Sequence, residues 1–254
     1  MRAIMRKIEE KKSTLERSRF VEWLIREDVP GAEKLSFAPA MAFFIMGFRD
    51  ILCSLKQRNP TTWAAKIVNQ HCDEDADHWR WYIEDLEKLG FDHTVWGGDL
   101  SGLFSRMWSD ETRESRNLVY LTMYHVRSAP SPEVLLVIIE VMEATFGVFS
   151  DALHRALQGM PAYSNLKYFG HTHRQEEESH AIGSWTQSGS HSEDIYGIQL
   201  PKEVREICFN IVDALFAQFQ EVFEEWYLSK NSYHQHSHQN CLQEKVGSYV
   251  RSLM

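Results

Sequence analysis

The sequence has no long apolar run and no segment resembling a secretory signal. Its most apolar stretch, FAPAMAFFIMGF at 37–48, is about a dozen residues long and is followed by Arg49 and Asp50. That length is too short to span a bilayer, so we expect a buried helix there. The charged stretch 1–13 lacks the apolar segment of a signal peptide. We therefore expect no membrane span and a cytoplasmic location.

The sequence also lacks a closely spaced cysteine pair and a basic stripe. Its four cysteines lie far apart without a CxxC pair, which predicts reduced thiols: Cys53, Cys72, Cys208 and Cys241. The net charge is −9, and no Lys/Arg stripe with interleaved aromatics is present. A nucleic-acid surface would need such a basic patch, so we expect no nucleic-acid partner.

Strand-like alternation is sparse, and IYGIQL at 195–200 is a short exception. Helical patterns predict three long helices, at 59–90, 131–159 and 201–230. In the first, Asn59 is the expected N-cap and Pro60 the first helical residue. In the second, Ser131 and Pro132 are expected at the same two positions.

The predicted fold is therefore a single all-α domain, 1–254, made of long packed helices. With 254 residues, 43% of them hydrophobic, the chain has an ordinary globular composition. We expect the core at about 37–230. The polar segment 231–254 contains the tract HQHSH and is expected to form a C-terminal helix or tail.

Twelve histidines are an excess for this length, and three of them lie in HTHRQEEESH at 171–180. On a helix, His173, Glu177 and His180 are spaced by four and three residues and share one face. This pattern is typical of one wall of a metal site. The alternative is a charged face that points to solvent.

A second cluster, HCDEDADH at 71–78, lies in the first long helix. Glu74 is four residues and Asp75 three residues before His78, so either carboxylate can share its face. His71 lies two turns before His78. The alternative is an amphipathic helix with its acidic side in water.

Glu140 and Glu143 are the only charges within VLLVIIEVMEATFGVF, at 134–149. An ionised carboxylate in such apolar surroundings is costly without a metal, a cation or a proton. At least one of the two should lie in the core. A protonated or hydrogen-bonded core glutamate is the alternative to a metal ligand.

Together these helices offer three imidazoles and three carboxylates. Such a mixed nitrogen and oxygen set suits iron or manganese, and its size fits two ions that share carboxylate bridges. Zinc would more often have cysteine ligands, and none of the four cysteines falls within this pattern.

At these residues the chain resembles the heme-oxygenase-like diiron oxidases and oxygenases. Their pattern is a carboxylate and a His on one core helix, a Glu on the next, and His-x3-Asp/Glu-x2-His on a third. His173, Glu177 and His180 match the last motif in full, and His78 matches the first imidazole. The remaining matches leave alternatives: Asp75 or Glu74 for the first carboxylate, and Glu143 or Glu140 for the second-helix Glu. Asp75 has the family's spacing but is shorter than its usual Glu.

The resemblance implies a heme-oxygenase-like bundle of about seven long helices that binds two Fe(II), or a Mn/Fe pair, and no heme. It implies O2 as co-substrate, an external electron donor and a small amino-acid-like or fatty-acid-like metabolite. The reactions implied are N-oxygenation and oxidative C–C cleavage or decarboxylation, within a biosynthetic pathway. Candidate pocket residues are Trp79, Tyr82, Phe146 and Tyr168. A homodimer is the base-rate expectation for the oligomeric state.

Two other readings compete. One is a metal-free heme-oxygenase-like protein, either an enzyme of the thiaminase or quinone-biosynthesis type or a small-molecule binding module; its His/Glu clusters would lie scattered on the surface. The other is a ferritin-like diiron carboxylate protein, whose paired Glu-x-x-His motifs are mimicked at 75–78 and 177–180. That protein would also need a Glu on a helix before residue 60, and 37–48 supplies none.

Overall fold

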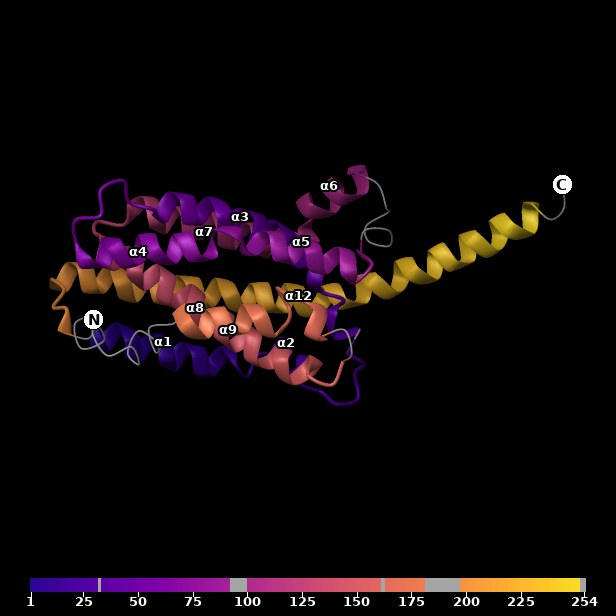
Figure 1. Ribbon diagram of the computed structural model, residues 1–254, viewed down its shortest axis with the longest axis horizontal. Helices are drawn as coiled ribbons and strands as arrows, with labels where there is room; N and C mark the ends of the chain where they lie inside the picture. Colours follow the sequence, from indigo (N-terminus) through magenta and orange to yellow (C-terminus); the bar gives the residue numbers. More distant parts are fainter. Residues whose placement is uncertain (32, 92–99, 161–162, 181–196, 252–254) are drawn as a thin grey trace.

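The chain folds as an all-α bundle in the computed structural model (Figure 1). The structure describes residues 1–31, 33–91, 100–160, 163–180 and 197–251, and within these ranges the side chains of all but 176–180 and 231–251. No strand occurs in the described ranges, so the predicted all-α class is confirmed. The first two residues of the strand-like stretch IYGIQL lie outside the described residues.

The described α-helices are α1 (Arg2–Leu15), α2 (Arg19–Leu24), α3 (Ala42–Leu55), α4 (Trp63–Glu74), α5 (His78–Lys88), α6 (Leu100–Trp108), α7 (Arg113–Ser128), α8 (Pro132–Leu157), α9 (His171–His180) and α12 (Lys202–Arg251). Short 3-10 helices join some of them: η1 (Glu33–Leu35), η2 (Ala38–Met41), η3 (Asp75–Asp77), η5 (Asp110–Thr112) and η6 (Tyr163–Asn165).

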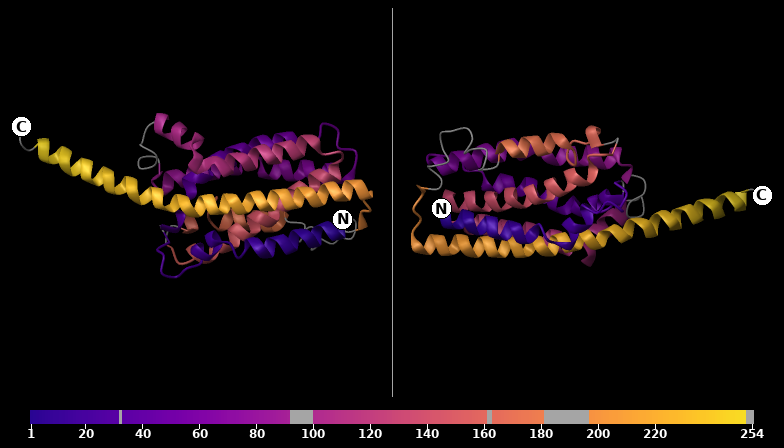
Figure 2. Two further views of the ribbon diagram at one scale, coloured as in Figure 1. Left: turned by 180° about the vertical axis from the view of Figure 1, so that it is seen from behind. Right: turned by 90° about the horizontal axis from the view of Figure 1, so that it is seen from below.

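Packing between long helices holds the bundle together. Helix α3 packs along α7, α4 packs on α8, and α1 lies against α8. Helix α12 packs against α1, α7 and α8. Helix α12 runs the length of the bundle and continues beyond it as one helix (Figure 2). The predicted end near residue 230 is therefore wrong for the backbone, which stays helical to Arg251.

The first predicted long helix begins later than expected and is interrupted. The hydroxyl of Thr62 accepts a hydrogen bond from the Ala65 N–H at 3.2 Å, which makes Thr62 the N-cap in place of Asn59. The one-turn 3-10 helix η3 separates α4 from α5, and the segment ends at Gly90, whose φ is 75°. The second predicted helix is confirmed at its start, because α8 follows Ser131 with Pro132 in its first turn.

Among the described residues, one segment, Glu33–Leu55, has the length and composition to cross a membrane. It folds as η1, η2 and α3, and 56% of its most apolar window is buried inside the bundle. Buried core helices of soluble proteins share these properties. The Tyr82 hydroxyl donates to the Ala38 carbonyl at 2.8 Å and ties this segment to α5.

Candidate metal centre

One stripe along α4, η3 and α5 carries ionisable side chains into the core. Its buried members recur at three- and four-residue steps: Val68, His71, Asp75, His78, Tyr82 and Asp85. Apolar residues at such steps mark the buried face of a helix. The 3-10 turn η3 lies in the middle of this stripe, and 3-10 stretches within helices often occur at functional positions.

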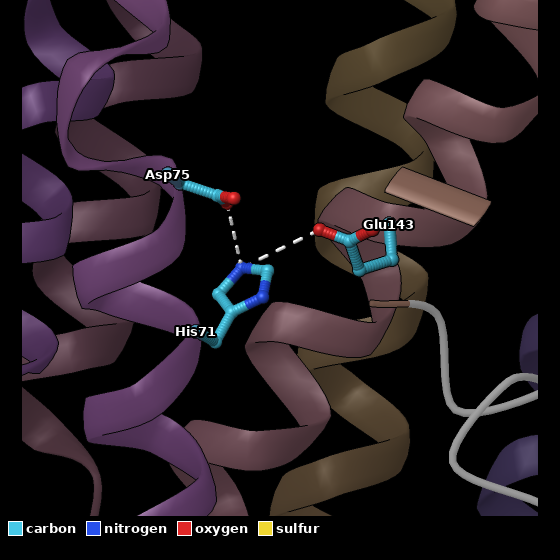
Figure 3. A group of neighbouring side chains, drawn as sticks. All are labelled: His71, Asp75 and Glu143. Atoms are coloured by element: carbon cyan, nitrogen blue, oxygen red, sulfur yellow. Dashed lines mark ion pairs between the residues drawn. The ribbon is translucent and has the colours of Figure 1, made fainter. Parts of the chain in front are cut away.

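Three side chains, from α4, η3 and α8, converge in this core (Figure 3). The Nε2 atom of His71 lies 3.0 Å from Asp75 Oδ2 and 3.4 Å from Glu143 Oε1 of α8. One ligand atom from each residue lies within 4.8 Å of the others. The side chains are 3%, 2% and 8% exposed, so solvent screens their charges only weakly.

The contacts of His71 fit a shared ion. Its buried Nε2 lies close to two carboxylate oxygens, yet it forms a hydrogen bond of acceptable geometry with neither of them. A nitrogen and two carboxylate oxygens that face one another in this way can act as ligands around a common point. A donor set of imidazole and carboxylates suits iron or manganese.

Asp75 faces a second imidazole with its other oxygen. Its Oδ1 lies 3.7 Å from His78 Nδ1, whereas its Oδ2 faces His71. A carboxylate whose two oxygens point to different imidazoles is placed to bridge two ions. The pair of metal ions itself stays a prediction.

His173 of α9 joins the cluster through His78, and a backbone contact sets its tautomer. Its Nδ1 lies 3.1 Å from the carbonyl oxygen of Tyr168. A carbonyl only accepts, so Nδ1 carries the proton and Nε2 keeps its lone pair. That Nε2 lies 3.1 Å from His78 Nδ1. Metal-binding histidines are commonly oriented in this way by a hydrogen bond from their other ring nitrogen.

The loop before α9 is held by a carboxylate of the same stripe. Asp85 is fully buried and accepts backbone N–H bonds from Lys167 at 2.9 Å and Phe169 at 3.0 Å. Gly170 follows, and a Cβ atom there would lie 1.9 Å from the carbonyl oxygen of Leu166. The loop can therefore approach this closely only with glycine, and it sets the position of His173.

The structure brings together four of the predicted ligands: Asp75, His78, Glu143 and His173. It favours Asp75 over Glu74, which is only partly buried and accepts a hydrogen bond from the Gln70 side chain at 2.9 Å. Glu177 and His180 lie on α9, but their side chains are outside the described residues.

Two residues of the site were not predicted. His71 and Asp85 were absent from the predicted set, although both lie on the buried stripe with Asp75 and His78. The spacing His71-x3-Asp75-x2-His78 is itself a one-face pattern, and it is the signal that could have found His71.

Glu140 takes no part in the cluster. It is buried and does not line the cavity that opens beside the cluster. The charge that acts on it is that of Glu9 of α1. Loss of hydration, and to a lesser degree Glu9, raises the pKa of Glu140 well above its usual value. By geometry Glu143 faces His71 and Glu140 does not, so Glu143 is the better candidate for a ligand.

Replacing Glu140 with glutamine should weaken the pH dependence of stability. A carboxyl whose pKa is raised by folding stabilises the fold below its unfolded pKa, and this contribution is lost as the pH rises through the folded pKa. From about pH 5 upwards, the free energy of unfolding of the wild type should therefore fall more steeply than that of Glu140→Gln, by up to about 1.4 kcal/mol per pH unit. Urea unfolding at several pH values measures both slopes. Parallel slopes for the wild type and Glu140→Gln would contradict the raised pKa of Glu140. The control is Glu87→Gln, which changes an exposed glutamate.

A narrow cavity of about 70 Å³ opens beside the cluster. Asp75, His78, Glu143 and His173 form part of its wall, and the remainder is mostly aromatic or aliphatic: Met41, Phe44, Ile45, Phe48, Met142, Phe146, Phe149, Tyr168, Phe219, Phe223 and Trp226. Three of the predicted pocket residues, Trp79, Phe146 and Tyr168, line it. Tyr82 does not, because its hydroxyl is bonded to the Ala38 carbonyl.

Comparison of the sequence with models of known protein families found no match, and comparison with curated proteins found none either. The resemblance to heme-oxygenase-like diiron enzymes therefore stays a prediction from the motifs. A function for this chain has to be argued from the buried cluster and the cavity beside it.

Proposed function

We propose that this protein is a non-heme diiron oxidase or oxygenase that uses O2 to oxidise a small metabolite. The observation that carries the proposal is a buried group of imidazoles and carboxylates on the wall of an aromatic cavity. Catalytic sites of this kind combine a mostly apolar pocket with a few convergent polar groups.

In this proposal His71, Asp75 and Glu143 would hold one ion, and His78, His173 and Asp75 would hold the second. The family resemblance adds Glu177 and His180 to this set. Bound ferrous ions would supply the electrons that activate O2 towards a substrate. The proposal includes an external electron donor. A Mn/Fe pair is the alternative to two iron ions.

The chain's own residues prepare the site in two ways. The Tyr168 carbonyl fixes the proton of His173 on Nδ1 and leaves Nε2 available as a ligand. Aromatic side chains from α3, α8 and α12 surround the cavity and exclude water from the place where a substrate would lie.

The competing functions find less support. A ferritin-like site needs a carboxylate on the helix before residue 60. The residues of η2 and α3 that line the cavity include no carboxylate: Met41, Phe44, Ile45, Phe48 and Arg49. A shared metal would account for the burial of several imidazoles and a carboxylate in one place, which a metal-free protein does not require: His71, Asp75, His78 and His173. Burying such polar groups is costly unless a partner compensates for it.

Oxygen uptake tests the proposal. Protein stripped of metal and reloaded anaerobically with Fe(II) should consume O2 in a burst that scales with protein concentration, with a transient visible absorption band. Metal-free and Zn(II)-loaded protein are the controls and should show no burst. The variants Glu143→Ala and His173→Ala should lose most of it. The absence of a burst, or a burst unchanged in both variants, would contradict the proposed function.

A further inference from the structure

Helices α6 and α7 expose a row of large apolar side chains. Six of their residues are 37–66% exposed and are called the α6–α7 face below: Leu100, Leu103, Phe104, Trp108, Tyr120 and Tyr124. Leu100, Phe104 and Trp108 are spaced by four residues, so they share one side of α6. Tyr120 and Tyr124 share one side of α7 in the same way.

The α6–α7 face is continuous and held in place. The ring of Phe43 on α3 joins its two halves, because it contacts Trp108 at 5.5 Å and Tyr120 at 6.0 Å. The buried guanidinium of Arg116 donates to the Met107 carbonyl at 2.6 Å and anchors the end of α6 on α7. No residue of α6 is itself buried. The fold therefore fixes α6 with its apolar side exposed.

The charges around this face favour a protein partner over a lipid surface. Arg106 is the one charged residue of α6, and its side chain is paired with Glu111 and only 17% exposed. Helices that lie on a lipid surface are usually rich in Lys and Arg. The whole chain has a net charge of −9, so its copies repel one another over most of their surface. They can best meet where the surface is uncharged, as it is here.

The size of the α6–α7 face fits one half of a dimer interface. At about 200 Å² for a fully exposed large side chain, the exposed fractions of its residues leave roughly 700 Å² uncovered. The largest apolar patch of a typical monomer covers about 300–600 Å², whereas a stable interface buries about 800 Å² of each partner. The exposed residues Ser101 and Ser105 of α6 can supply the remainder.

The same end of the bundle holds a second element that extends away from it. Helix α12 leaves the bundle at the end where α6 lies and continues as one helix to Arg251 (Figure 1 and Figure 2). Helices in proteins gain most of their stability from packing against other elements. Each copy of the chain brings both elements to this end, so a two-fold pairing can cover both at once. A second copy therefore fits this end better than an unrelated protein.

We propose that the α6–α7 face is the interface of a homodimer, in which it packs against the same face of a second copy about a two-fold axis. Such a pairing needs a surface that complements itself, and an uncharged aromatic surface meets this requirement. Aromatic residues are also enriched at the centres of protein interfaces. The pairing involves none of the candidate metal ligands, so it does not rest on the proposed function.

Analytical ultracentrifugation of the full chain, metal-free and metal-loaded, tests this interface. The variants Phe104→Glu and Tyr124→Glu each place a charge in the interface from both copies. Ile207→Glu is the matched control, because Ile207 is an apolar residue of α12 that is 40% exposed and lies outside the face. Circular dichroism checks that each variant is folded, and cosedimentation with phosphatidylcholine vesicles is measured in parallel.

The wild type and Ile207→Glu should sediment with twice the mass of one chain at micromolar concentrations, with or without metal. The dissociation constant of the dimer should rise about 30-fold or more in each of the two face variants. A wild type that stays monomeric at high micromolar concentration would overturn the interface, as would face variants that dimerise like the wild type. Masses that grow beyond two chains would contradict a closed two-fold pairing. Vesicle binding by a monomer, lost in the face variants, would assign the face to a lipid surface instead.

Discussion

Replacing Asp75 with asparagine is expected to lower the affinity for Fe(II) by roughly 100-fold or more and to reduce the number of bound ions. Asp75 is the residue whose two oxygens face both His71 and His78. Asparagine keeps the shape but removes the charge and replaces one oxygen with an NH2 group, which cannot act as a bridging ligand. Metal analysis after anaerobic loading and gel filtration gives the stoichiometry, and titration gives the affinity.

The neighbouring carboxylate provides a matched control. Glu74→Gln changes the same charge one residue away, at a side chain that is partly exposed and bonded to Gln70. We expect it to bind metal as the wild type does. Equal losses in both variants would mean that a general change in negative charge is responsible. An Asp75→Asn protein with unchanged stoichiometry would contradict the bridging position assigned to Asp75.

Replacing Asp85 with alanine is expected to destabilise the fold by about 3 kcal/mol. The carboxylate is fully buried and accepts the N–H groups of Lys167 and Phe169. Without it, these two donors lose their partner in the segment that leads to His173. Equilibrium unfolding in urea measures the loss of stability. Because this segment positions α9, the variant should also bind metal more weakly.

The control for Asp85 lies on the same helix. Glu87 is exposed, and Glu87→Ala should change the free energy of unfolding by no more than about 0.5 kcal/mol. Asp85→Asn keeps one acceptor oxygen and should fall between the wild type and alanine. A stable Asp85→Ala protein would show that the 167–169 loop is held by other contacts.

Much of the fold could be predicted from local patterns. Ser131 and Pro132 mark the start of α8 because proline fits the first turn of a helix. The start of α4 was misplaced because Asn59 and Thr62 are both good N-caps, and only the bond from the Ala65 N–H selects Thr62. The sequence left 231–254 open between a helix and a tail, because a mostly polar segment gives a weak signal for a helix; the backbone of α12 stays helical to Arg251.

The candidate site was predicted in part, for a related reason. Spacing placed Asp75 and His78 on one face, but sequence alone does not say which face of an amphipathic helix is buried. His71 was left out because its role depends on α4 packing against α8, which brings Glu143 to it. Glu140 and Glu143 share one apolar run, and only the packing of α1 and α4 on α8 separates their surroundings.

The most direct measurement is an anomalous difference map at the iron edge from crystals loaded anaerobically with Fe(II). Our account predicts one peak among His71 Nε2, Asp75 and Glu143, and a second beside His78 and His173. Ligand distances should be about 2.0–2.3 Å, as for other first-row metals bound by nitrogen and oxygen. A map with no peak in this core, or with iron only at the histidine tract 234–238, would contradict the central claim.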